Sequence, residues 1–179
     1  DWGVLAPWSN GQVDQSVHSM LGRLVLGPRL QVTRLEIANT QFDVGATRPL
    51  TPAAQRWIEA GAKAVATLFE GRFPAERVSL LVVNVPGRKV GFGEARRGGG
   101  PHVMVVLGER ASEEHMLADW TLPHELLHVG LPTVRSADAW LSEGLATYLQ
   151  NVAMARGGLH SAQTAWQELY DGFQRGAKI

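Results

Sequence analysis

The chain has 179 residues, 45% of them hydrophobic, which predicts one domain with its own core and leaves too little length for a second full domain. The formal net charge is zero, from 17 basic and 17 acidic side chains, so we expect no nucleic-acid partner. The chain contains no cysteine, which excludes disulfides and thiolate metal sites and leaves histidine and carboxylate side chains as the available metal ligands.

The longest apolar runs are short. Residues 103–108 form one of them, far below the ~20 residues that a membrane-spanning helix needs, so no membrane segment is predicted. The first residue is Asp1 rather than methionine. We therefore expect a processed form or a fragment of a larger protein, from which further domains or a targeting segment can have been removed.

The first half of the chain is predicted to contain strands and one long helix. Residues 1–19 show no sustained hydrophobic period, and we interpret them as an irregular lead-in to a single domain over residues 20–179. A helix is predicted to begin at Thr51-Pro52, which has the cap and the first-turn proline of a helix. Strand patterns occur at residues 23–26, 30–37, 41–44 and 77–85, and the last of these is continuously apolar, as is typical of a buried central strand.

Residues 86–101 are the most glycine-rich part of the chain, with six glycines and four basic side chains. A phosphate-binding loop would be followed by a helix, whereas residues 103–107 have the pattern of another strand. We therefore expect a mobile, solvated loop over residues 86–101. Its position before the next helices makes it a candidate rim for a cleft.

Three helical patterns follow. The first leads from Ser112 towards residue 130, and Pro123 within it predicts either a kink or the start of a new helix close to Leu122. The second is capped by Ser136 or Asp138 and ends at a pair of glycines, and the last begins near residue 161. Strands followed by helices predict an α+β domain.

The sequence His124-Glu125-Leu126-Leu127-His128 has a metal-binding pattern. Histidines four positions apart lie on one face of a helix, at a separation that lets two ring nitrogens bind one zinc ion at ~2.0–2.1 Å. Glu125 lies beside them, where its carboxylate can take a proton from water activated by the metal. Glu143 is the candidate third ligand, and Asp138 is the other nearby carboxylate. The alternative for the histidines is a buried pair that is satisfied by hydrogen bonds.

Residues 124–128, together with the segment Trp-Leu-Ser-Glu-Gly-Leu-Ala-Thr-Tyr at residues 140–148, resemble the gluzincin metallopeptidases, particularly the aminopeptidase N and glycyl aminopeptidase families. The resemblance implies a small mixed β-sheet packed against helices in a thermolysin-like zincin catalytic domain, with Zn²⁺ between two helices. It also implies a peptide or protein substrate. Relatives of this kind are often extracytoplasmic in bacteria, so we expect a periplasmic or secreted location.

In those families the downstream segment supplies the third zinc ligand, which assigns this role to Glu143. Fourteen residues separate His128 from Glu143, fewer than in the families, so the loop between the two helices is shortened. A turn is enough to bring a second helix alongside the first. Thr147, one turn after Glu143, is predicted to support this ligand.

The families also carry a glycine-x-Met-Glu-Asn motif whose glutamate holds the free amino end of a peptide. Residues 91–95 read Gly-Phe-Gly-Glu-Ala, which keeps the glycine and the glutamate but not the methionine or the asparagine. Glu94 is therefore the predicted substrate-binding residue. The alternative is a loop carboxylate beside Arg96 and Arg97.

A peptidase of this type needs a second group to stabilise the oxyanion. Only Tyr148 and Tyr170 supply a phenol. Tyr148 lies five positions after Glu143, about 140° around the helix, so we expect it to face the core. Tyr170 is predicted to fold back over the site as a catalytic residue, with a core-facing position as the alternative, and His102 and His160 are further candidates.

These residues predict a gluzincin-type zinc peptidase that hydrolyses peptide bonds with metal-activated water and Glu125 as general base. The alternative is a non-catalytic domain that keeps the zinc for stability or for binding a peptide. The imperfect amine-binding motif and the missing oxyanion stabiliser motivate this alternative.

Overall fold

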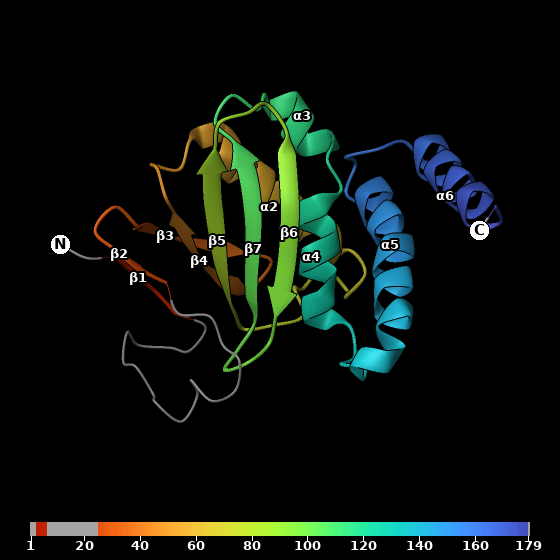
Figure 1. Ribbon diagram of the computed structural model, residues 1–179, viewed down its shortest axis with the longest axis horizontal. Helices are drawn as coiled ribbons and strands as arrows, with labels where there is room; N and C mark the ends of the chain where they lie inside the picture. Colours follow the sequence, from red (N-terminus) through yellow and green to blue (C-terminus); the bar gives the residue numbers. More distant parts are fainter. Residues whose placement is uncertain (1–2, 7–24, 179) are drawn as a thin grey trace.

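The computed structural model describes residues 3–6 and 25–178. Its centre is a five-stranded mixed sheet in the order β3-β4-β5-β7-β6. Figure 1 shows α4, α5 and α6 following one another outward from the β6 edge of this sheet. The strands of the sheet are β3 (Gln31–Ile37), β4 (Thr40–Ala46), β5 (Arg77–Val85), β6 (Val90–Arg96) and β7 (His102–Gly108).

The helices are α2 (Pro52–Ala66), α3 (Glu113–Ala118), α4 (Thr121–Gly130), α5 (Ala139–Arg156) and α6 (Ala162–Gly176), and the 3₁₀ helix η2 (Ser136–Asp138) precedes α5. Thr51 caps α2 as predicted, because its side chain accepts a hydrogen bond from the Ala54 N–H at 3.1 Å. The predicted small mixed sheet with helices packed against it is confirmed. Among the described residues, no helix has both the length and the hydrophobicity to cross a membrane.

The three central strands, β4, β5 and β7, are parallel, and the outer strands β3 and β6 run antiparallel to their neighbours. Parallel strands are normally covered on both faces, which explains the apolar run in β5. One face packs against α2 and α4 in the main core, which includes Trp57, Leu122 and Leu126. This packing holds α4 firmly beside the β6 edge.

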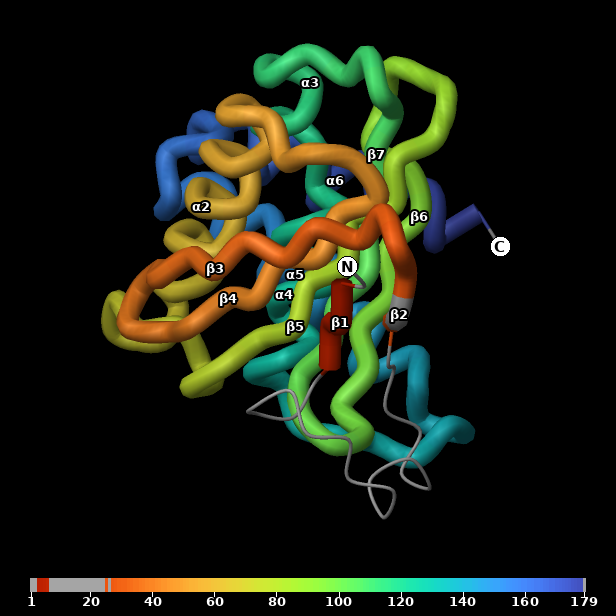
Figure 2. Tube along the Cα trace, turned by 90° about the vertical axis from the view of Figure 1, so that its left-hand side faces the viewer, coloured from red at the N-terminus to blue at the C-terminus, as the bar shows by residue number. Residues whose placement is uncertain are grey.

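A short pair of strands covers part of the opposite face. β1 (Gly3–Leu5) pairs antiparallel with β2 (Val25–Gly27), and Leu5 packs with Leu30 and Leu81. Figure 2 shows this pair in front of the sheet, with α5 and α6 behind it. The prediction of an irregular lead-in is therefore wrong for residues 3–5, because strand pairing and the burial of Leu5 order them. The remainder of that segment, residues 7–19, and the start of the strand predicted at 23–26 lie outside the described residues.

The predicted solvated loop over residues 86–101 contains β6. This prediction is wrong for residues 90–96, which pair with β7 along most of their length. Pairing with a neighbouring strand stabilises an extended backbone even where glycines contribute no side-chain packing. Only the turns on either side remain as loops, and Gly99, with φ of 73°, supports the turn from β6 to β7.

Pro123 lies in the first turn of a new helix, the second of the two predicted alternatives. α3 ends at Ala118 and α4 begins at Thr121. The Thr121 N–H donates a hydrogen bond to Oδ1 of Asp119 at 2.8 Å. Proline is tolerated at such a position because the first N–H groups of a helix have no partner within it. The break turns the apolar face of α4 towards the sheet independently of α3.

Candidate metal centre

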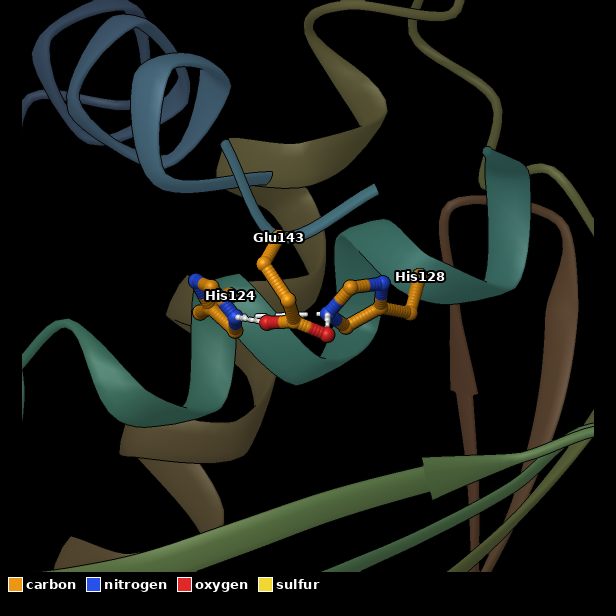
Figure 3. A group of neighbouring side chains, drawn as sticks. All are labelled: His124, His128 and Glu143. Atoms are coloured by element: carbon orange, nitrogen blue, oxygen red, sulfur yellow. Dashed lines mark hydrogen bonds and ion pairs between the residues drawn. The ribbon is translucent and has the colours of Figure 1, made fainter. Parts of the chain in front are cut away.

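His124 and His128 on α4 converge with Glu143 on α5 (Figure 3). The two Nε2 atoms lie 3.2 Å apart, Nε2 of His124 lies 3.2 Å from Glu143 Oε2, and Nε2 of His128 lies 3.5 Å from Glu143 Oε1. Within residues 3–6 and 25–178, this is the one group of three such side chains able to hold a metal ion. The structure thus brings together the three residues that the sequence analysis selected.

The spacing of these atoms fits a tetrahedral zinc site. Ligands bound at ~2.0–2.1 Å in a tetrahedron lie about 3.3 Å from one another. The two Nε2 atoms are 3.2 Å apart, and each lies at a similar distance, 3.2 or 3.5 Å, from a different oxygen of the Glu143 carboxylate. Two imidazoles and one carboxylate are a ligand set that suits zinc and leaves a fourth position for water or substrate.

Two side chains of α5 orient the histidine rings. Oε1 of Gln150 lies 2.7 Å from Nδ1 of His124, and Oγ of Ser142 lies 3.3 Å from Nδ1 of His128. With the Gln150 oxygen as acceptor, Nδ1 of His124 carries the hydrogen and Nε2 keeps its lone pair for a metal. Thr147 was predicted for this kind of support, and Gln150 was not. Because Gln150 follows Glu143 by seven positions, two helical turns, the spacing alone could have indicated it.

Glu125 is a buried carboxylate beside the ligands, only 8% exposed. Burial raises its pKa to about 7 against the opposing charge of His124, and the charges of Glu143 and Glu94 add to the increase. A hydrogen bond with the Ala95 backbone lowers the pKa and connects Glu125 to β6. A carboxylate of this kind suits proton transfer at neutral pH, since a general base works best when its pKa lies near the working pH.

β6 approaches α4 closely at Gly93. A Cβ atom there would lie 2.5 Å from Cγ of Glu125 and 2.9 Å from Cγ2 of Thr121, closer than such atoms can approach. The glycine is therefore required by packing against α4, and it keeps Glu125 in place. No hydrophobic pattern in the sequence signals this contact, because Gly93 and Glu125 lie 32 positions apart on different elements.

Two clefts meet at the metal-binding group. The first cleft, of about 560 Å³, contains His128 and is bordered by the end of β6 and the segment after α4. The second cleft, of about 1060 Å³, contains His124 and is bordered by α5 and α6. They share Phe92, Gly93, Glu125 and Glu143. Residues 86–101 were predicted as a candidate rim for a cleft, and part of this glycine-rich segment borders both clefts.

The structure separates the two tyrosines. Tyr170 is 58% exposed and lines neither cleft. Contrary to the prediction, it does not reach the metal-binding group. α6 turns Leu169 and Phe173 towards the second cleft, and Tyr170 is rotated by 100° from Leu169. Tyr148 was expected in the core, but it is 40% exposed and lines the second cleft.

The other predicted candidates occupy different places. Glu94 lines the first cleft, and its Oε1 accepts hydrogen bonds from Arg96 Nε at 2.9 Å and Nη2 at 2.8 Å. His160 lines the second cleft. His102 is fully buried on β7, with Nδ1 3.1 Å from Oγ of Ser79, and lines neither cleft. It is a core histidine.

Comparison with known proteins gives a structural likeness only. No protein-family model and no curated protein matches the chain. An aminopeptidase N family protein from Idiomarina loihiensis superposes with a TM-score of 0.62 and 15% identity over 92% of this chain and 33% of its own. A two-domain M1 zinc metallopeptidase variant bound to L-arginine has a TM-score of 0.49 and 18% identity, over 96% of this chain and 42% of its own. The chain thus spans about a third of the first protein, and it has the fold of that part of an aminopeptidase N family protein.

Proposed function

We propose that this chain is the catalytic domain of a gluzincin-type zinc peptidase. His124, His128 and Glu143 would hold the metal, and Glu125 would act as general base. The observation that supports this proposal most strongly is the convergence of the two histidine Nε2 atoms on the Glu143 carboxylate, with separations of 3.2–3.5 Å that are close to the ligand spacing of a tetrahedral zinc site. The shared fold with part of an aminopeptidase N family protein agrees with it.

When bound, the zinc ion supplies a Lewis acid that acidifies water and polarises a carbonyl group. Glu125 accepts a proton from the attacking water and passes it to the leaving nitrogen of the cleaved bond. Among the described strands, β6 pairs with β7 alone and is an edge strand, so a peptide can lie along it as an added strand. A substrate in this position would extend from one cleft into the other past Glu125.

The first test is metal removal. We expect one zinc ion per chain by elemental analysis and cleavage of a proteome-derived peptide pool, detected by mass spectrometry. A chelator should abolish cleavage, and added zinc should restore it. If zinc is bound and its removal lowers the melting temperature, but no peptide is cleaved under any condition, the non-catalytic zinc domain is the correct assignment. Absence of stoichiometric zinc would contradict both.

We further propose Tyr148 as the second oxyanion stabiliser, because it is the tyrosine that lines the cleft containing His124 and Glu125. Tyr148→Phe should lower kcat by about 100- to 1000-fold with little change in KM, the usual effect of removing one oxyanion donor. Tyr170→Phe is the matched control and should keep the original rate. Equal rates for the two variants would remove Tyr148 from the mechanism.

Glu94 is proposed to contact the free amino end of a peptide, because it lines the first cleft and its charge acts on Glu125. An amine there would share the carboxylate with Arg96. Glu94→Gln should raise KM about tenfold for peptides with a free amine and leave KM unchanged for their acetylated counterparts. A similar KM change for both peptide types would show that Glu94 holds no amine.

A further inference from the structure

Arg97 follows directly after β6, and its guanidinium donates hydrogen bonds to neutral groups. Nη1 donates to Oγ1 of Thr133 at 3.0 Å, and Nη2 donates to the backbone carbonyl of Leu131. Both partners belong to the segment that follows α4 and borders the first cleft. The side chain is therefore fixed in orientation, while partial burial lowers its pKa without a carboxylate to offset the loss of water.

The other two arginines that line the first cleft are each paired with a carboxylate. Arg96 is paired with Glu94 at 2.8 Å, and Arg135 is paired with Asp138 at 2.9 Å. Among the described residues, Arg97 is the one arginine lining this cleft whose hydrogen-bond partners include no carboxylate. Arg97 and the predicted metal ligands His128 and Glu143 line the same cleft. Arg97 is thus an oriented cation close to the metal-binding group.

We propose that Arg97 is a specificity residue that binds a carboxylate of the substrate in the first cleft. This inference rests on the proposed peptidase function. A guanidinium forms paired, charge-assisted hydrogen bonds with a carboxylate, and one that is already oriented loses less freedom on binding. The carboxylate can come from an aspartate or glutamate side chain of the peptide or from its carboxyl terminus.

Binding to a zinc-loaded Glu125→Gln variant tests this inference without turnover. The probes are fluorescent hexapeptides of one sequence rich in alanine and glutamine, in which glutamate replaces one residue at a time. Each peptide is made with a free and with an amidated carboxyl end, and Kd is measured by fluorescence anisotropy. We expect tighter binding, by roughly tenfold or more, either for glutamate at one position or for the free carboxyl end. These two results distinguish the two sources of the carboxylate.

Adding Arg97→Gln should remove this preference, and Arg97→Lys should restore only part of it, because an ammonium lacks the planar fork of donors. Arg135→Gln is the matched control and should keep the preference, since Arg135 lines the same cleft but is paired with Asp138. Zinc content and melting temperature show whether each variant is folded. Equal affinity for all the probes, or a preference that persists in Arg97→Gln, would overturn the inference. Carboxylate-dependent binding without cleavage by the unaltered protein would instead refute the peptidase function alone.

Discussion

Glu125→Gln should reduce peptide cleavage by about 100- to 10,000-fold while one zinc ion per chain remains bound, because the amide cannot accept a proton from water. The substitution keeps the size of the side chain, and Glu125 is not among the three residues whose ligand atoms converge. Burial disfavours the charged form of Glu125, so a neutral amide at this position should not lower the melting temperature. The measurements are kcat and KM on a cleaved peptide, elemental analysis of zinc, and thermal unfolding.

Glu168→Gln is the matched control for Glu125→Gln. Glu168 also lines the second cleft, but it lies on α6 rather than beside the metal ligands. Its amide should leave kcat within a few-fold of the original value. If Glu125→Gln cleaves peptides at the original rate, another group activates the water and the proposed mechanism is wrong. If it loses zinc as well as activity, Glu125 contributes to metal binding instead.

Gly93→Ala should lower kcat by about 100-fold and leave zinc bound. The added Cβ would lie 2.5 Å from Cγ of Glu125, so the carboxylate must move or β6 must separate from α4. A displacement of about 1 Å at a reacting group can cost this much in rate. The three atoms nearest to the new methyl group belong to Glu125 and Thr121. None of them belongs to a predicted metal ligand, so zinc stoichiometry should not change.

Gly91→Ala, two residues earlier on β6, provides the control. A Cβ at Gly91 meets its nearest atoms, on Val106, at 3.6 Å, which is an ordinary contact. Both substitutions restrict the unfolded backbone in the same way, so the comparison isolates the packing against Glu125. We expect kcat for Gly91→Ala within a few-fold of the original. Equal kcat for the two variants would show that Gly93 does not position the base.

The local part of the metal centre could be predicted from the sequence, because it depends on the spacing of residues along one helix. His124 and His128 share a face of α4 whatever α4 packs against. Glu143 could not be obtained in this way, and the resemblance to a family selected it. The short connection through η2 nevertheless brings α5 beside α4, so fourteen residues suffice to place Glu143 between the two histidines.

Predictions failed where tertiary packing overrides local composition. β6 has no hydrophobic alternation, and its strand structure comes from pairing with β7, whose paired residues lie between six and seventeen positions later in the chain. The orientation of α5 was also not predictable, because its buried face carries Gln150 and Asn151 while Trp140 and Leu141 are exposed. A helical wheel gives the angle between Tyr148 and Glu143, but it does not show which side a neighbouring element covers.

The distribution of the ligands over two helices has a kinetic consequence. α4 is buried against the sheet, whereas α5 lies outside it and the Glu143 side chain is 61% exposed. Outer elements of a protein open locally at a lower free energy than its core. Undocking of α5 would remove Glu143 together with Gln150 and Ser142, the two residues that orient the histidine rings. We therefore expect the exchange rate of a bound metal to follow the local opening of this single helix, and not the global unfolding of the domain.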